Sequence, residues 1–512
     1  MQLSEKINIL KNNQNIYSKI CCFWIFIVAS LAVSPWFFNH VQEAKSQLII
    51  WLFLFFLGTI FFCKPLLTRS ILLISSTGVF IKTMILIFIL SIAVSLYIAP
   101  HKLIALDGFR VGTWIPILAV FIAYLLLSPK DIVRFTFYGA FLMAVLGILQ
   151  IAFDVRTFTP NTDSGQFPAI TMGNRGIATT FVALGFVPGL AMLREGGKKV
   201  KWIVFCGIIA IATFLILGLT RATWFGVLVA GVIWFFFSQK QKKPYGLLTN
   251  LSFYQKGTLI LVFLVLIAVI IWLFRHEYLY SLIFDRLFVM ETWVENPRFM
   301  VWYKTLEGWL QTPWYQIIFG VGPGQFQVFG HTWLAGTGLL SHGFYQEAHN
   351  DYVQTLIEWG LVGFGIRILL IMLGIKRLWR FYKDYRSFDA LALVSNVCLI
   401  LAVAVFFFPL TLPHLMVIFC VTLFPNLDMN KENPGMRKFQ FWHYMLGRII
   451  ALIGFVLLTW HSYDRIKLEY RMHEYFWVEK SFEEKMRQKT EIQNLLKGTS
   501  APWFYPYLIE TL

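Results

Sequence analysis

Long apolar runs separated by short polar segments cover most of the chain. A helix that crosses a bilayer needs roughly 20 mostly apolar residues. About thirteen runs meet or approach that length. They lie near 20–38, 47–63, 82–99, 110–127, 131–152, 175–193, 200–219, 221–238, 258–274, 350–375, 388–407, 410–425 and 442–460. The pattern predicts an all-α, polytopic membrane protein with 12–13 transmembrane helices. The run at 66–80 is a weaker candidate because Arg69 interrupts it.

The basic residues between these runs indicate the orientation of the chain. Short cytoplasmic loops carry an excess of Lys and Arg. Basic residues lie before the first run and then in every second loop, most densely at 194–201, 240–243 and 376–386. This alternation predicts a cytoplasmic N-terminus. It places the long loop 275–348 and the tail 461–512 on the opposite side of the membrane.

Composition changes this picture little. The chain has 512 residues, 58% of them hydrophobic and 14% charged, with a net charge of +17. The basic residues are scattered over the predicted cytoplasmic loops, where anionic lipid headgroups are natural partners, and are not gathered into one nucleic-acid-binding surface. All six cysteines lie in or beside apolar runs, so we expect neither a disulfide framework nor a cysteine metal site. We expect no cleavable signal peptide.

The long loop 275–348 has the composition of a folded segment. It contains five tryptophans, many other aromatic residues and few charges. Asn296-Pro297 predicts a helix start, as cap and first position. One face of that helix is predicted to be apolar, and we expect the helix to lie along the membrane surface. The residues of that face are Phe299, Trp302, Leu306, Trp309 and Leu310.

The segment Glu347-Ala348-His349-Asn350-Asp351-Tyr352 joins this loop to an apolar run. Asp351 with Gln354 three residues later predicts a capping box, so a helix should begin close to His349. A helix N-terminus favours neutral imidazole, which a general base requires. The alternative is a histidine that only caps or anchors the helix. Asn350 and Asp351 are supporting residues of this candidate site.

Three arginines are candidate anion-binding residues on the same side. Arg221 joins two apolar runs with almost no loop, Arg298 lies in the first turn of the predicted surface helix, and Arg175 follows Gly173-Asn174. A guanidinium offers a planar fork that suits phosphate oxygens, and a helix N-terminus adds further donors. The alternatives are a snorkelling side chain for Arg221 and a solvated helix face for Arg298.

Two other patterns do not predict nucleotide or metal chemistry. Gly320-Val321-Gly322-Pro323-Gly324 lacks the strand, the helix and the Lys-Ser/Thr of a phosphate-binding loop, so it reads as a tight turn. His331, His342 and His349 match no metal-ligand spacing. We expect neither a cofactor nor a metal. A base beside several arginines suits a donor that is already activated as a diphosphate.

The ordered motifs resemble the O-antigen ligase and polymerase superfamily of bacterial envelope glycosyltransferases. The likeness is strongest over about 170–425 and rests on five segments in family order. They are Leu219-Thr220-Arg221-Ala222-Thr223-Trp224, Arg298 with Trp302, Ile318-Phe319-Gly320-Val321-Gly322-Pro323-Gly324-Gln325-Phe326, Ala348-His349-Asn350-Asp351-Tyr352 through Gly360, and Phe408-Pro409-Leu410-Thr411-Leu412-Pro413. The chain departs from the family at Gly173-Asn174-Arg175-Gly176, where members often carry Asn-Pro-Asn.

The resemblance implies a metal-independent, inverting glycosyltransferase in the bacterial inner membrane, acting at the periplasmic face. The implied donor is a glycan on undecaprenyl diphosphate, and the acceptor is lipid A core or another glycan. His349 would be the base, and Arg221 and Arg298 would bind the diphosphate. The implied organisation is N-terminal helices at 1–169, a catalytic core at 170–425, a last transmembrane helix within 426–460 and a tail at 461–512.

Three rival functions remain open at this point. A polymerase of the same fold would join glycan units to one another, and a third member type glycosylates pilin. A solute transporter would belong to a different class. Transporters generally carry ionisable groups or broken helices near the middle of the membrane, whereas here the main polar cluster lies at the outer rim. Glu358, Arg367 and His414 are the exceptions.

Overall fold

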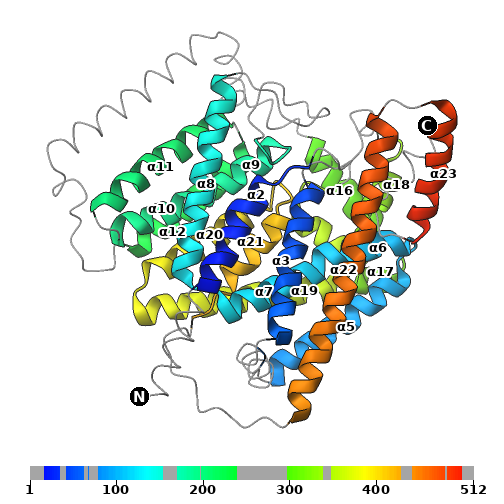
Figure 1. Cartoon of the computed structure of the whole chain (residues 1–512), viewed down its shortest axis with the longest axis horizontal. Coiled ribbons are helices and arrows are strands. Elements are labelled where there is room, and N and C mark those ends of the chain that lie inside the picture. Colours follow the sequence, from blue (N-terminus) through cyan, green and yellow to red (C-terminus); the bar gives the residue numbers. More distant parts are fainter. Residues whose placement is uncertain are drawn as a thin grey trace.

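The computed structural model describes residues 16–34, 42–62, 67, 79–153, 170–195, 198–218, 220–238, 297–337, 347–427, 441–478 and 481–498. These residues form helices and turns and contain no β-strand (Figure 1). Eight helices are long and apolar enough to cross a membrane, and four shorter apolar helices accompany them. The all-α, polytopic architecture is therefore confirmed. The predicted run at 258–274 lies outside the described residues.

The helices follow the predicted runs closely. In chain order they are η1 (Trp24–Val28), α2 (Ala29–Leu31), α3 (Gln42–Phe62), α5 (Val79–Ile98), α6 (Lys102–Phe109), η2 (Arg110–Trp114), α7 (Ile115–Leu126), α8 (Pro129–Ala152), α9 (Arg175–Ala183), α10 (Phe186–Glu195), α11 (Lys198–Leu217), α12 (Arg221–Ser238), α16 (Pro297–Leu310), α17 (Trp314–Phe319), α18 (Phe326–Leu334), α19 (Asp351–Tyr385), α20 (Phe388–Val403), α21 (Pro413–Leu423), α22 (Phe441–Trp477) and α23 (Phe482–Gly498).

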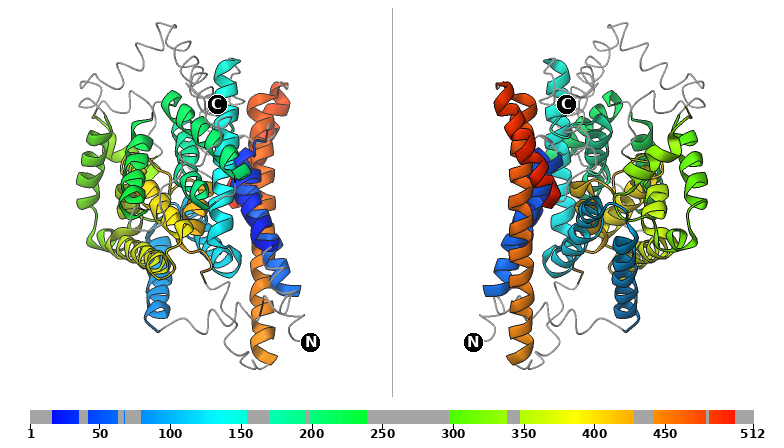
Figure 2. Two further views of the ribbon diagram at one scale, coloured as in Figure 1. Left: turned by 90° about the vertical axis from the view of Figure 1, so that its left-hand side faces the viewer. Right: turned by 90° about the vertical axis from the view of Figure 1, so that its right-hand side faces the viewer.

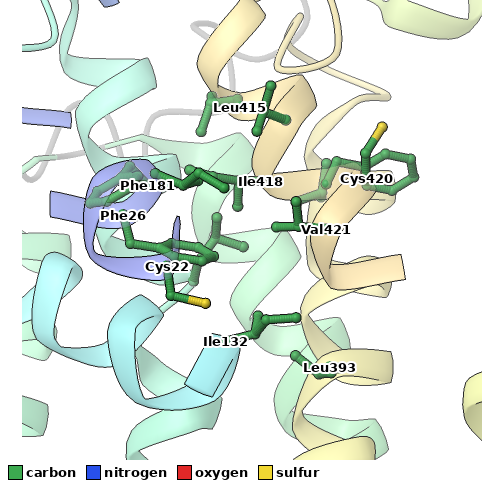
Figure 3. Packing of buried hydrophobic residues seen from close by; sticks show 14 of the residues in the cluster. Cys22, Phe26, Ile132, Phe181, Leu393, Leu415, Ile418, Cys420 and Val421 are labelled. Atoms are coloured by element: carbon green, nitrogen blue, oxygen red, sulfur yellow. The ribbon is translucent and has the colours of Figure 1, made fainter. Parts of the chain in front are cut away.

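Helices α20 and α21 lie at the centre of the bundle. Nearly every residue of both is buried, as expected of short apolar helices that are enclosed by longer ones. Phe26, Ile132 and Phe181 from other helices pack with Leu393 and Val421 in this core (Figure 3). The core fixes α20 and α21, and therefore also the connection between them.

Helix α19 is broken at Gly360, whose φ of 63° and ψ of −175° are not helical. The break brings the glycine-rich turn against the helix. Val321 N donates to the carbonyl of Ile357 at 3.0 Å, and Gly322 N donates to that of Glu358 at 3.1 Å. A Cβ atom on Gly360 would lie 2.3 Å from Gly320 N. The turn therefore supplies N–H donors to two carbonyls at the break, and the Glu358 carbonyl also accepts from the Ser95 hydroxyl at 3.4 Å.

The C-terminal part of the chain forms a helical hairpin. Helix α22 runs without a break from Phe441 to Trp477, and α23 folds back beside its last turns (Figure 2). Leu468, Met472 and Ile492 are fully buried between the two helices. Part of the predicted tail therefore continues the last membrane helix.

A buried ion-pair network joins α22 to helices from the beginning of the chain. Arg465 contacts Glu43 at 3.3 Å and Glu469 at 3.3 Å. Arg110 contacts Glu43 at 3.3 Å and Asp107 at 3.0 Å. Charges buried among apolar helices are stable only when they are paired in this way. The network fixes α22 against α3 and η2.

Candidate functional site

The connection between α20 and α21, residues 404–412, organises one end of the bundle. Asp351 N donates to the carbonyl of Ala404 at 3.0 Å, and Leu410 N donates to Asp351 Oδ2 at 2.8 Å. Both bonds join the first residue of α19 to this segment. The segment is anchored in turn by the buried core helices on either side of it. The beginning of α19 therefore has a fixed position.

The N-cap of α19 is Asn350, whose side chain accepts from Tyr352 N at 2.9 Å and Val353 N at 3.1 Å. The helix begins where the sequence predicted, but the prediction that Asp351 caps it is wrong. Asp351 points to Leu410 instead, because the 404–412 segment offers a free N–H there. Gln354 Oε1 accepts from Ala348 N at 3.1 Å, two residues before the N-cap, so the predicted capping box does not form.

His349 is half-buried immediately before this helix. Its φ of 54° places it in the left-handed region, which is uncommon outside glycine and is often found at functional sites. The imidazole lies edge-on to Phe408, with ring centroids 5.1 Å apart. Burial and the nearby Arg298 guanidinium lower the pKa of His349 from 6.5 to about 4. The ring is therefore neutral near pH 7 and can accept a proton.

Arg298 reaches the same segment from α16. Its guanidinium donates to the carbonyl of Phe406 at 3.0 Å. One turn further along the helix, the Trp302 indole donates to the carbonyl of Ala348 at 2.8 Å and its ring lies 6.3 Å from that of Phe406. Helix α16 therefore contacts both the 404–412 segment, through Arg298, and the backbone of Ala348 next to His349, through Trp302.

The predicted apolar face of α16 is partly wrong. Trp309 is buried and Leu306 packs beside it, but Phe299 and Leu310 are exposed. The buried face also includes Val301, which the prediction omitted. The face is rotated toward α18 and α19, which pack against α16 among the described helices. The exposed aromatic residues fit a helix at a membrane surface.

Arg221 and Arg175 are the first residues of α12 and α9. The first turn of α12 touches the second turn of α9, since the Thr223 hydroxyl lies 3.2 Å from that of Thr179 and 3.4 Å from that of Thr180. Two helix N-termini that begin with arginine therefore lie together. Each presents backbone N–H groups and positive partial charge at this end of the bundle.

Both helix starts also border the 404–412 segment. Phe225 of α12 packs against Phe406, with ring centroids 5.8 Å apart. A Cβ on Gly176 would lie 3.0 Å from Phe407. Asn174 caps α9 by accepting from Gly176 N at 2.7 Å. In this chain Gly173-Asn174-Arg175-Gly176 thus forms a capped helix start.

The site contains a second set of polar residues that the sequence analysis did not select. Gln354 Nε2 donates to Glu358 Oε1 at 3.3 Å, and Phe326 N donates to the same oxygen at 3.3 Å. Burial and the neighbouring Glu358 raise the pKa of Glu347 to about 8. Residues 350, 354 and 358 recur every four positions, and this polar helix face in an apolar run was the available signal.

Taken together, the predicted site residues converge. His349, Arg298 and Asp351 contact the 404–412 segment directly, and Arg221 and Arg175 begin the two helices that border it. The glycine-rich turn lies beside them as a structural turn, as predicted. A neutral imidazole, guanidinium groups and helix N-termini at a membrane surface are suited to an anionic, membrane-embedded substrate.

Comparison with known proteins agrees with this arrangement. A search of curated proteins found no significant match. Residues 206–368 match the family model described as O-antigen ligase. The matched segment contains Arg221, Arg298 and the start of α19 with His349, but ends before the 404–412 segment. Residues 206–368 thus carry a domain of the O-antigen ligase superfamily, in a multi-pass membrane protein.

Proposed function

We propose that this protein is a glycosyltransferase of the O-antigen ligase type. It transfers a glycan from undecaprenyl diphosphate to an acceptor hydroxyl at the periplasmic face of the inner membrane. The observation that carries the proposal is the convergence of His349, Arg298 and the first turns of α9 and α12 on the 404–412 segment. The family match independently covers the two main arginines and the histidine.

The proposed reaction is a single displacement. The acceptor oxygen attacks the anomeric carbon as the bond from that carbon to the phosphate oxygen breaks. The hydroxyl proton moves to His349, and undecaprenyl diphosphate leaves with the bonding electron pair. Attack opposite the leaving group inverts the anomeric centre. Arg298, Arg221 and, in a lesser role, Arg175 neutralise the charge that develops on the diphosphate.

The pKa of His349 suggests how the donor prepares its own base. In the free protein Arg298 helps to hold the pKa near 4, which makes the imidazole a weak base. A bound diphosphate would neutralise the Arg298 charge and add negative charge nearby. Both changes favour the imidazolium and raise the pKa of His349. Proton transfer therefore becomes easier only when the donor is in place.

A polymerase of the same fold remains the second candidate, because the family match does not distinguish the acceptor. The transporter alternative is less well supported. The structure does contain one broken helix, at Gly360, but the carbonyls freed there bind the glycine-rich turn. In transporters such freed groups coordinate the solute or ion.

The deciding experiment compares lipopolysaccharide from a deletion strain with that from strains complemented by wild type or by His349→Ala. A ligase null lacks all O-antigen on lipid A core, whereas a polymerase null retains a single unit. We expect the His349→Ala strain to match the null while the variant reaches the membrane in normal amount. Normal glycan transfer by a well-expressed His349→Ala protein would remove His349 from the mechanism.

A further inference from the structure

The two peptide groups that flank Ala348, directly before His349, are each held by a side chain. Ala348 is fully buried, its N–H donates to Gln354 Oε1 at 3.1 Å, and its carbonyl accepts from the Trp302 indole at 2.8 Å. Gln354 belongs to α19 and Trp302 to α16. Two separate elements therefore hold the backbone of one small residue.

These two hydrogen bonds, called the clamp below, lie next to the backbone bond that sets the direction of the His349 imidazole. The Ala348 carbonyl and the His349 N–H share one rigid peptide plane, and rotation about the next bond is the φ of His349. That φ is 54°, which is unfavourable for a residue with a Cβ. Left to itself, the backbone would relax and the ring would turn. Contacts that fix the plane therefore also fix the ring.

Glu358 fixes Gln354 in turn. The Gln354 amide donates through Nε2 to Glu358 Oε1 at 3.3 Å, so its oxygen faces Ala348 N. The Glu358 carboxylate also accepts from Phe326 N at 3.3 Å. The chain of contacts runs from α18 through α19 to Ala348. It continues through Trp302 to the helix that carries Arg298.

We propose that Trp302 and Gln354 are positioning residues that clamp the backbone of Ala348, Trp302 at the Ala348–His349 peptide and Gln354 at the peptide before it, and thereby aim the imidazole at the acceptor hydroxyl. The proposal rests on the proposed function, since it assigns these residues to the same site. Because Trp302 lies on α16 with Arg298, the clamp also sets the distance between the base and the diphosphate-binding helix. Neither residue touches the reacting atoms.

Trp302→Phe tests the first half of the clamp. The variant removes the indole N–H but keeps an aromatic ring beside Phe299 and Phe406. Trp309→Phe is the matched control. It makes the same change on the same helix, at a buried indole whose N–H has no hydrogen-bond partner among the described residues. We expect Trp302→Phe to lower kcat on lipid-linked donor roughly tenfold or more, with the donor KM almost unchanged, and Trp309→Phe to keep a normal kcat.

Gln354→Met tests the second half, because Met has a similar shape but no amide. Gln325→Met is its control, since Gln325 is also buried and donates one hydrogen bond, to the carbonyl of His101 at 2.9 Å. The double variant Trp302→Phe/Gln354→Met completes a cycle. Because both side chains hold the backbone of one residue, Ala348, we expect the double variant to lose much less than the product of the two single losses.

The outcomes separate the clamp from the proposed function. If purified wild type does not turn over a lipid-linked glycan, the proposed function fails. If wild type is active but Trp302→Phe and Gln354→Met retain its kcat, only the clamp is refuted. The clamp is also refuted if Trp302→Phe and Gln354→Met raise the donor KM and leave kcat unchanged. It is refuted as well if each variant and its control lose the same amount of thermal stability and the same amount of activity.

Discussion

The neutral state of His349 connects its burial to the pH dependence of the reaction. Its pKa is about 4 in the free protein, lowered by burial and by Arg298. A general base acts in its neutral form, so kcat/KM should stay level from pH 7 down to about pH 5 and fall as the pH approaches 4. Bound diphosphate raises the pKa, so kcat should fall at a higher pH than kcat/KM. Rates across this range, in a reconstituted assay, measure both profiles.

Arg298→Gln is the check on this interpretation. Without the guanidinium the pKa of His349 should rise toward 6.5, although burial keeps it below that value. The acid limb of kcat/KM should therefore move upward in whatever activity remains. An acid limb that stays near pH 4 in Arg298→Gln would show that Arg298 does not act on His349.

The arginines differ from simple cations in their shape. Arg221→Lys and Arg298→Lys keep the charge but lose the planar fork that binds two phosphate oxygens at once. We expect each variant to lose roughly tenfold or more in kcat/KM, and the loss should persist at saturating acceptor. Two Lys variants with wild-type kinetics would favour simple anchoring of both helices at the membrane surface.

At the residue scale, the candidate site residues could be predicted from the sequence, but the contacts that hold them in place could not. His349, Arg298 and Arg221 stood out because polar residues at the ends of apolar runs are unusual. The clamp on Ala348 could not be predicted, because an alanine offers no side-chain signal and its partner Trp302 lies 46 residues away. The capping assignment to Asp351 failed for a similar reason, since the competing donor at Leu410 comes from a distant segment.

Among the secondary-structure elements, α19 offers the sharpest test. Gly360→Ala should be severely destabilising, on the order of 3 kcal/mol or more. Its backbone conformation suits glycine almost alone, and the new Cβ would lie 2.3 Å from Gly320 N. Gly365→Ala is the control on the same helix, because a Cβ there meets nothing within 4 Å. We expect this change to be neutral or to stabilise by about 0.5–1 kcal/mol.

Thermal unfolding of the two purified variants in detergent provides the measurement. Equal melting temperatures for Gly360→Ala and Gly365→Ala would mean that the glycine-rich turn does not pack closely against α19 at Gly360. The helices themselves were predictable from hydrophobic length. The break was not, because a glycine in an apolar run is compatible with an intact helix, and the turn that fills the break lies some 40 residues earlier.

For the whole molecule, the orientation of the helices decides which compartment the site faces. The alternating basic loops predict that the long loop and the tail are periplasmic. In a cysteine-free background, Gln311→Cys and Glu484→Cys should react with an impermeant thiol reagent once the outer membrane is permeabilised. Gln241→Cys and Asp384→Cys should react only after the inner membrane is broken. Positions 311, 384 and 484 are exposed.

The reverse labelling pattern would contradict the proposed function, because His349 and Arg298 would then face the cytoplasm. The order of the long apolar helices was predictable from the apolar runs, whereas the short helices α17 and α18 and the division of the run at 175–193 into α9 and α10 were not. The contact between α22 and α3 was not, because helices that face lipid and helices that face protein are similarly apolar.

The ion pair between Glu43 and Arg465 has a consequence for how the protein is made. The ribosome delivers Glu43 and Arg110 to the membrane long before Arg465 has been synthesised. Until then two charged groups of the first helices have only part of their final surroundings. The ion-pair network of the first helices is therefore completed only when α22 is inserted and packs against α3. A chain that stops before residue 465 would leave Glu43 with only one of its two arginine partners, Arg110, and would therefore be less stable in the membrane.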